Sequence, residues 1–205
     1  MIIGLAGAHR CGKSTLARIL SDELNIKLFE TNTADVAKAM GVNAVGSLTL
    51  SERLNFQQKL LAHHISALKS RDICITDRTP LDMASYMLCE IGMNHLNERE
   101  NDELDARIVD YLELCVEATA KYYTGVLCLC PLDTYEVLPG KPTNSAAYQA
   151  HVQMCIKGLL MEVMGRTNVI ICMDTALTKR VECGIDFVNA IIKSTSIIPP
   201  GVVIH

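Results

Sequence analysis

The sequence has no run of eighteen apolar residues, although 49% of its 205 residues are hydrophobic. A helix that crosses a bilayer needs about 20 such residues, so we expect no membrane-spanning segment. Residues 1–7 are apolar, but they lack the basic lead of a secretory signal peptide and are too few to form one. No low-complexity tract is present either. These absences indicate a folded globular protein, which we expect in the cytoplasm.

A surplus of positive charge is also missing. The chain has 19 Lys and Arg against 23 Asp and Glu, which gives a formal net charge of −4. Proteins that bind polyanions without sequence preference usually carry a basic surplus. A nucleic acid is therefore a possible partner, but not the favoured one.

The nine cysteines include no C-x-x-C pair. Several lie inside apolar runs, namely Cys74, Cys128, Cys130 and Cys172. Buried, reduced thiols explain this distribution, and the spacing indicates neither a disulfide framework nor a zinc site.

Short apolar runs alternate with segments of helical periodicity along the chain. Strands are expected at residues 2–6, 26–29, 72–77, 125–130 and 168–172. Helices are expected at residues 13–24, 33–40, 51–70, from 80 onward, 100–122, 145–164 and 175–192. This alternation predicts an α/β fold, with a five-stranded parallel sheet and helices on both faces. Residues 1–193 are expected to form a single domain, and residues 194–205 a C-terminal appendage.

A glycine-rich loop joins the first expected strand to the first expected helix. It reads GAHRCGKST and matches the Walker A spacing G-x-x-x-x-G-K-S. Backbone N–H groups of such a loop surround phosphate oxygens at a helix N-terminus; Lys13 would contact the β and γ phosphates and Ser14 would bind Mg²⁺. The expected ATP-binding residues are Gly7, Ala8, His9, Arg10, Cys11, Gly12, Lys13, Ser14 and Thr15.

Two weaker interpretations of this loop stay open. It could be a strand–helix turn that binds no ligand. Cys11 could be a redox switch, because helix N-termini lower thiol pKa values, or simply a small residue that the loop tolerates.

The third expected strand ends in Asp77 and Arg78, an acid followed by a base. A motor ATPase usually has paired carboxylates there, and a GTPase would show an N-K-x-D stretch, which this sequence lacks. One carboxylate beside Mg²⁺, with an adjacent guanidinium, suits an acceptor that offers a hydroxyl or a phosphate. The alternative is a helix cap with a surface ion pair.

The Walker A loop together with D-R-T-P at residues 77–80 resembles the P-loop nucleoside and nucleotide kinases, such as deoxynucleoside and thymidylate kinases. The longer string D-R-T-P-L-D with Tyr86 is most similar to the nicotinamide-riboside-kinase-like group of AAA-type ATPases. The resemblance covers roughly residues 1–165. It implies the three-layer P-loop fold, with Asp77 beside Mg²⁺ and the acceptor as base or positioning group. Arg78 would hold the acceptor or the phosphoryl group, and Asp82 is a weaker substrate candidate.

The acceptor is expected between residues 30 and 70. Arg53, Phe56 and Gln57 share a side of the long helix with Leu60 and His64. A guanidinium, a ring and an amide one turn apart can hold a phosphate, stack on a base and read its edge. The alternative is a half-buried helix flank with solvated polar ends. The neighbouring His63 and His64 face different sides of a helix, so we expect no metal there.

A lid is expected at residues 131–149, because a kinase must keep water from the transferred phosphate. Pro139-Gly140-Lys141 stands where the related group carries an acid-glycine-x-arginine signature. Lys141 can neutralise phosphate charge, but without the bidentate geometry of arginine.

The expected function is the transfer of the γ-phosphate of ATP to a nucleoside or nucleoside monophosphate, in deoxynucleotide metabolism. The partner is then a small molecule, and a homodimer is possible. Two alternatives remain: a kinase for a hydroxyl of a modified base in DNA, and a non-kinase ATPase that regulates a partner.

Overall fold

A computed structural model describes residues 1–31, 33–43, 48–70, 73–94, 102–132 and 145–195. Five parallel strands form one sheet in the order β2-β3-β1-β4-β5. The strands are β1 Ile2–Ala6, β2 Leu28–Phe29, β3 Cys74–Thr76, β4 Gly125–Leu129 and β5 Asn168–Cys172.

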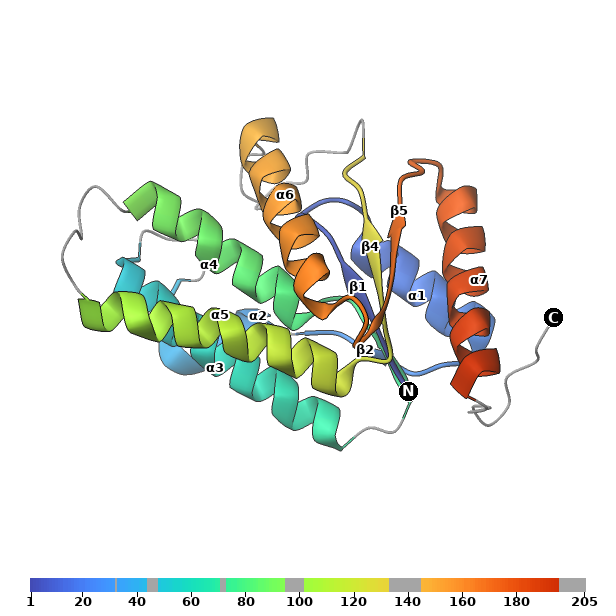
Figure 1. Cartoon of the computed structure of the whole chain (residues 1–205), viewed down its shortest axis with the longest axis horizontal. Helices are drawn as coiled ribbons and strands as arrows, with labels where there is room; N and C mark the ends of the chain where they lie inside the picture. Colours follow the sequence, from blue (N-terminus) through green and yellow to red (C-terminus); the bar gives the residue numbers. More distant parts are fainter. Residues whose placement is uncertain (32, 44–47, 71–72, 95–101, 133–144, 196–205) are drawn as a thin grey trace.

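Helices cover both faces of this sheet (Figure 1). They are α1 Lys13–Leu24, α2 Thr33–Met40, α3 Leu50–Lys69, α4 Pro80–Asn94, α5 Asp102–Tyr122, α6 Ala146–Val163 and α7 Leu177–Thr195. Helices α1 and α7 lie on one face, while α4 and α6 lie on the other with α3 and α5 packed outside them (Figure 1). The predicted α/β fold with a five-stranded parallel sheet is confirmed.

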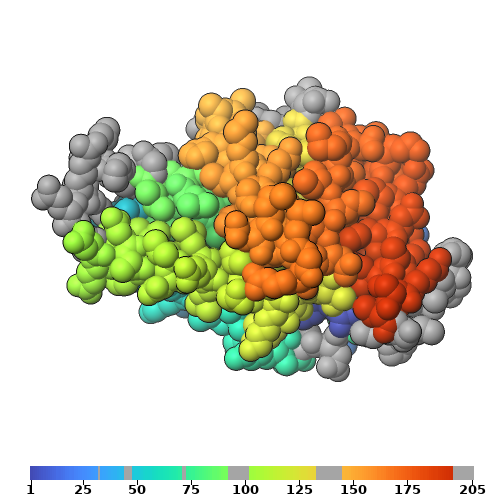
Figure 2. All heavy atoms as spheres, viewed as in Figure 1, coloured from blue at the N-terminus to red at the C-terminus, as the bar shows by residue number. Residues whose placement is uncertain are grey.

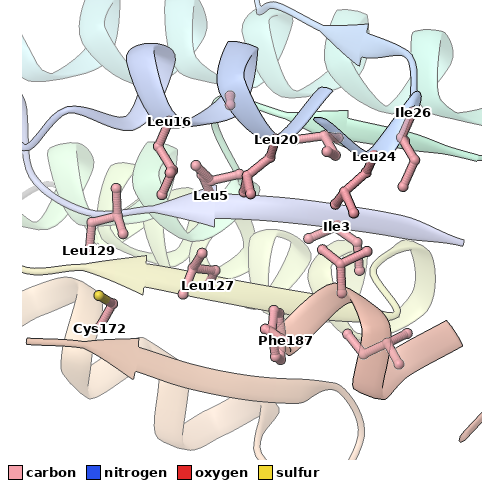
Figure 3. Packing of buried hydrophobic residues seen from close by; sticks show 14 of the residues in the cluster. Ile3, Leu5, Leu16, Leu20, Leu24, Ile26, Leu127, Leu129, Cys172 and Phe187 are labelled. Atoms are coloured by element: carbon pink, nitrogen blue, oxygen red, sulfur yellow. The ribbon is translucent and has the colours of Figure 1, made fainter. Parts of the chain in front are cut away.

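The alternation of side chains along each strand builds the two layers. Ile3 and Leu5 of β1 point toward α1 and α7, where they meet the helical leucines and Phe187 (Figure 3). Ile2 and Ala6 point to the opposite face and join the core beneath α4 and α6. Strands buried on both faces read as continuous apolar runs, as these do.

The strand register brings the two sequence motifs together. Gly4 of β1 pairs with Thr76 of β3, so the loop after β1 and the residues after β3 leave the same edge of the sheet. Ligands of open parallel sheets bind outside this edge, at the carboxyl ends of the strands. We therefore expect the functional site at the carboxyl ends of β1 and β3.

Element boundaries differ from expectation where local chemistry was decisive. Helix α3 begins at Leu50, because Thr49 and Glu52 form a reciprocal capping box. Helix α7 continues to Thr195, past the expected boundary at residue 193. The division into one domain and an appendage stays a prediction, since residues 196–205 lie outside the described residues. Among the helices described, none is both long and apolar enough to cross a membrane.

Candidate active site

The loop between β1 and α1 contains three residues with positive φ angles. Gly7 and Gly12 adopt φ angles of +146° and +86°, and Arg10 lies at +59°. A Cβ on Gly7 would come within 2.6 Å of the carbonyl oxygen of Leu129. Only glycine therefore fits at residue 7, and the loop can fold tightly against the end of β4.

Lys13 points back into its own loop. Its Nζ donates to the carbonyl oxygens of Gly7 at 2.5 Å and Ala8 at 2.9 Å, and lies 3.6 Å from Oδ1 of Asp82. Burial alone would lower the pKa of Lys13, but the ionisable groups of Cys11 and Asp82 outweigh it, and the pKa is raised. The lysine is thus held as a cation at the loop.

Ser14 and Asp77 lie in contact, although 63 positions separate them. The Oγ of Ser14 donates to Oδ2 of Asp77 at 3.2 Å, and the backbone N–H of Thr31 donates to Oδ1 at 3.1 Å. A hydroxyl and a carboxylate side by side offer the hard oxygen ligands that Mg²⁺ prefers. The donor set therefore fits the magnesium ion that the sequence predicts at these two residues.

Asp82 is fully buried beneath the loop. Its Oδ1 accepts from the backbone N–H of Gly7 at 3.2 Å, and its Oδ2 accepts from the N–H and Oγ1 of Thr79 at 2.8 and 2.7 Å. These contacts tie the start of α4 to the phosphate loop. The placement of Asp82 at the substrate stays a prediction.

Cys11 is fully buried, and its sulfur receives a weak hydrogen bond from Lys13 at 3.8 Å. Burial raises the pKa of its thiol, although Lys13 opposes this. A redox-active cysteine needs an exposed, acidic thiol. The structure therefore favours the interpretation of Cys11 as a small packed residue.

Two glutamines of α6 hold the phosphate loop, and sequence reasoning made no prediction for them. Gln153 accepts from the N–H of Ala8 at 2.9 Å and donates to the carbonyl of Leu129 at 3.1 Å. Gln149 donates to the carbonyl of His9 at 2.7 Å. Their four-residue spacing on the buried side of a helix was the available signal, because buried amides need partners.

Arg180 of α7 is a third residue that sequence reasoning missed. Its buried guanidinium donates to the carbonyl oxygens of Cys11 at 2.5 Å, Cys130 at 2.8 Å and Asp174 at 2.6 Å. One side chain thus joins the phosphate loop, the end of β4 and the segment after β5. Nothing in its local sequence distinguishes it from an exposed helical arginine.

His64 of α3 supports the end of β3 through a chain of hydrogen bonds. One ring nitrogen lies 2.9 Å from Oγ1 of Thr31 and the other lies 2.6 Å from the hydroxyl of Tyr123, which also contacts Thr76 at 3.2 Å. Burial lowers the pKa of His64 to about 3, with Arg78 adding to the effect, so the ring is neutral. His63 is exposed, and the expectation that the two histidines face different sides is confirmed.

The three α3 residues predicted to meet the acceptor are buried rather than solvated. Arg53, Phe56 and Gln57 on α3 are 8%, 2% and 6% exposed. The Nε of Arg53 lies 3.5 Å from Oε1 of Glu90 on α4. The buried Oε1 of Gln57 has no hydrogen-bond partner among the described residues. The alternative of a helix flank with solvated polar ends does not fit this burial.

Arg78 lies beside an aromatic ring, which is itself part of a small group of rings. Its guanidinium lies 5.9 Å from the ring centroid of Tyr86, and His9 packs near the rings of Tyr86 and Tyr148 at 6.5 and 5.6 Å. Lys141 and residues 133–144 of the expected lid lie outside the described residues. The structure thus brings Lys13, Ser14, Asp77 and Asp82 together, and Arg53, Phe56 and Gln57 lie on one buried side of α3.

The chain is similar in fold to solved kinase structures. It matches deoxyadenosine kinase from M. mycoides with bound dCTP at a TM-score of 0.60 and 15% identity, over 93% of this chain and 100% of that one. It matches thymidylate kinase from Candida albicans at a TM-score of 0.62 and 17% identity, over 95% of this chain and 92% of that one. It matches NadR in complex with NR at a TM-score of 0.65 and 15% identity, and the whole of this chain spans 52% of that one.

These similarities establish the P-loop kinase fold. No curated protein matches the chain significantly. A family profile described as "AAA domain" matches residues 2–171, which is most of the chain and includes the phosphate loop, Asp77 and α6. The chain therefore belongs to this AAA-domain family.

Proposed function

We propose that the protein transfers the γ-phosphate of ATP to a nucleoside or a nucleoside monophosphate. The 3.2 Å contact between Ser14 and Asp77 carries this proposal. It brings the hydroxyl of the phosphate loop to the single carboxylate at the end of β3, and Arg78 follows immediately. This arrangement suits an acceptor more than an activated water.

The resident side chains account for each requirement of the transfer. Lys13 and the loop N–H groups hold the triphosphate, and Ser14 and Asp77 would hold Mg²⁺. When bound, Mg²⁺ neutralises charge on the β and γ phosphates. Arg78, whose guanidinium lies 5.9 Å from the ring centroid of Tyr86, would bind the acceptor or the phosphoryl group.

The atoms balance with Asp77 as the proton acceptor. A hydroxyl oxygen of a nucleoside forms a bond to the γ-phosphorus as the bond to the bridging oxygen breaks, and ADP leaves. The hydroxyl proton passes to Asp77. A monophosphate acceptor attacks as an anion, so in that case Asp77 only positions it.

We infer that the base of the acceptor binds at the buried side of helix α3. The unpartnered Oε1 of Gln57 is a buried acceptor, and a nucleobase carrying an N–H donor would satisfy it. Arg53 is one turn away and can add a phosphate contact. The neighbouring structures were solved with dCTP and with NR, respectively, and this agrees with a nucleoside or nucleotide acceptor.

ADP formation from Mg²⁺-ATP tests the proposal. The purified chain is assayed alone, then with pooled nucleosides, pooled nucleoside monophosphates or duplex DNA. We expect ADP to rise only with nucleosides or monophosphates, and the Lys13→Met variant to be silent throughout. Phosphate transfer to DNA would establish a DNA-directed kinase instead. ATP hydrolysis that no acceptor changes would establish a regulatory ATPase.

A further inference from the structure

Three side chains of the types that bind metal ions meet between helices α4 and α6. They are Cys89 of α4 and His151 and Cys155 of α6, and their ligand atoms all lie within 4.8 Å of one another. Within the part of the chain that the structure describes, this is the one such group of Cys, His, Asp and Glu residues. Figure 2 shows α4 and α6 in contact on the face viewed.

The helix geometry explains how the group forms. His151 and Cys155 are four residues apart, so they lie one above the other on the same side of α6. Cys89 faces them from α4, and the thiols of Cys89 and Cys155 are in hydrogen-bond contact. The sequence indicated no zinc site, and it could not show this one: the ligands are divided between two helices, and C-x-x-C spacing is absent.

We propose that Cys89, His151 and Cys155 form a binding site for Zn²⁺. Two thiolates and an imidazole bind Zn²⁺ in preference to Mg²⁺ or Ca²⁺, which favour oxygen ligands. Tetrahedral zinc sets such donor atoms about 3.5–3.8 Å apart, so the three side chains need to close by only about 1 Å. Both thiol protons leave to solvent on binding, and a water completes the fourth position.

A disulfide between the two cysteines explains less of the geometry. It would leave the imidazole of His151 without a role in the cluster. Cys89 is fully buried, whereas Cys155 is partly buried and His151 is exposed. An ion can therefore enter from solvent past His151 and reach the buried sulfur last.

The site lies between α4 and α6, two of the three helices shown above to contact the phosphate loop. Helix α4 carries Asp82, which accepts from Gly7, and α6 carries Gln153, which accepts from Ala8. Zinc between α4 and α6 would fix these helices relative to each other. Its occupancy should therefore stabilise the fold independently of any acceptor.

Zinc binding by the tag-free chain in a non-thiol reductant tests the site directly. Zinc alone is titrated in competition with a chromophoric chelator, and melting is followed with and without zinc. Wild type should bind one zinc per chain with a raised melting temperature. Cys155→Ser and His151→Ala should each bind at least tenfold more weakly, with no zinc-dependent rise in melting. The matched controls Cys183→Ser and His63→Ala should behave as wild type.

Cobalt provides a second measurement of the same ligands. Wild type loaded with Co²⁺ should show thiolate-to-cobalt charge-transfer absorption, and Cys155→Ser should lose most of it. Because His151 is exposed, its alanine variant keeps the test valid even if cysteine variants fold poorly. Equal zinc affinity in wild type and the His151→Ala/Cys155→Ser double variant would overturn the proposal. Formation of a Cys89–Cys155 disulfide in air, with no zinc bound by the reduced chain, would also overturn it.

Discussion

The carboxylate of Asp82 accepts a hydrogen bond from the backbone N–H of Gly7 at 3.2 Å, across 75 positions of sequence. This contact joins the first turn of α4 to the first glycine of the phosphate loop. The other carboxylate oxygen accepts two hydrogen bonds from Thr79. Asp82 therefore holds the shape of the loop, and Lys13 balances its charge from 3.6 Å away.

Asp82→Asn should destabilise the protein by about 1–3 kcal/mol and weaken ATP binding. Whichever way the amide turns, its NH₂ group faces either the Gly7 N–H or the two Thr79 donors. Urea unfolding and ATP titration measure the two effects, with the exposed Asp105→Asn as control. If stability and ATP affinity are unchanged and only the acceptor KM rises, Asp82 contacts the substrate and not the loop.

Lys13→Met should lower phosphoryl transfer at least about 100-fold, because it removes the cation that contacts the phosphates. It also leaves the buried Asp82 without its cation, so some stability should be lost. That loss should shrink in an Asp82→Asn background, as a double-mutant cycle shows. Lys38→Met, at an exposed position, is the control. Normal turnover in a folded Lys13→Met variant would remove the loop from the mechanism.

The sequence motif identified the residues of the phosphate loop itself, but not the residues of other helices that hold the loop in place. Gly7, Lys13 and Ser14 stand in a contiguous motif with a known spacing. The alternation of strands and helices predicted a parallel sheet, and Asp77 ends a strand at the same edge of it. Gln153 and Arg180 reach the loop from α6 and α7, which are 145 and 169 positions away from their partners. Such contacts depend on how helices pack, and no local pattern encodes them.

The burial of α3 shows the same division. Helical periodicity correctly grouped Arg53, Phe56 and Gln57 on one side of α3. It could not tell whether that side meets solvent or protein, because α4 decides this by covering it and supplying Glu90. Boundaries shifted for similar reasons: the Thr49 capping box fixed the start of α3 more sharply than periodicity could.

Acidification should destabilise the protein through His64. Burial lowers the pKa of His64 to about 3, below its usual 6.5, so the unfolded state binds the proton first as pH falls. The stabilisation is fully present above pH 6.5 and is lost below it, by about 2 kcal/mol between pH 7 and pH 5. Urea unfolding at the two pH values measures it. His64→Gln should flatten the dependence and the exposed His63→Gln should not; equal slopes for wild type and His64→Gln would contradict the assignment.

Asp77→Asn should keep ATP binding and lose most of the transfer to a nucleoside. The amide is nearly isosteric and can still accept from Thr31, but it neither takes a proton nor offers a charge to Mg²⁺. ATP titration and single-turnover transfer separate the two properties, with Asp22→Asn as an exposed control. Collapsed ATP affinity with normal residual turnover would show that Asp77 only supports the nucleotide site.

Gln57→Leu should weaken acceptor binding by about 1–3 kcal/mol and leave ATP affinity nearly unchanged. The leucine fills the same buried space but removes the Oε1 that has no partner among the described residues. Fold stability should therefore hold or rise, because the variant deletes an unsatisfied acceptor. Kinetics against thymidine, thymidine monophosphate and nicotinamide riboside measure the effect, and equal losses for ATP and every acceptor would assign α3 to the scaffold.

Arg53→Ala should impair a monophosphate acceptor far more than a nucleoside, because only the monophosphate offers a dianion to the guanidinium. The experiment must separate loss of the phosphate contact from loss of an ion pair within the protein. The Nε of Arg53 lies 3.5 Å from Oε1 of the partly buried Glu90, so the substitution also removes this ion pair. Glu90→Gln is the matched control, since it breaks the pair and keeps the arginine.

The measured quantity is the ratio of kcat/KM for thymidine monophosphate to kcat/KM for thymidine. If Arg53 binds phosphate, Glu90→Gln should leave this ratio intact, whereas Arg53→Ala should lower it at least tenfold. Equal shifts of that ratio in both variants would mean that Arg53 serves the ion pair alone.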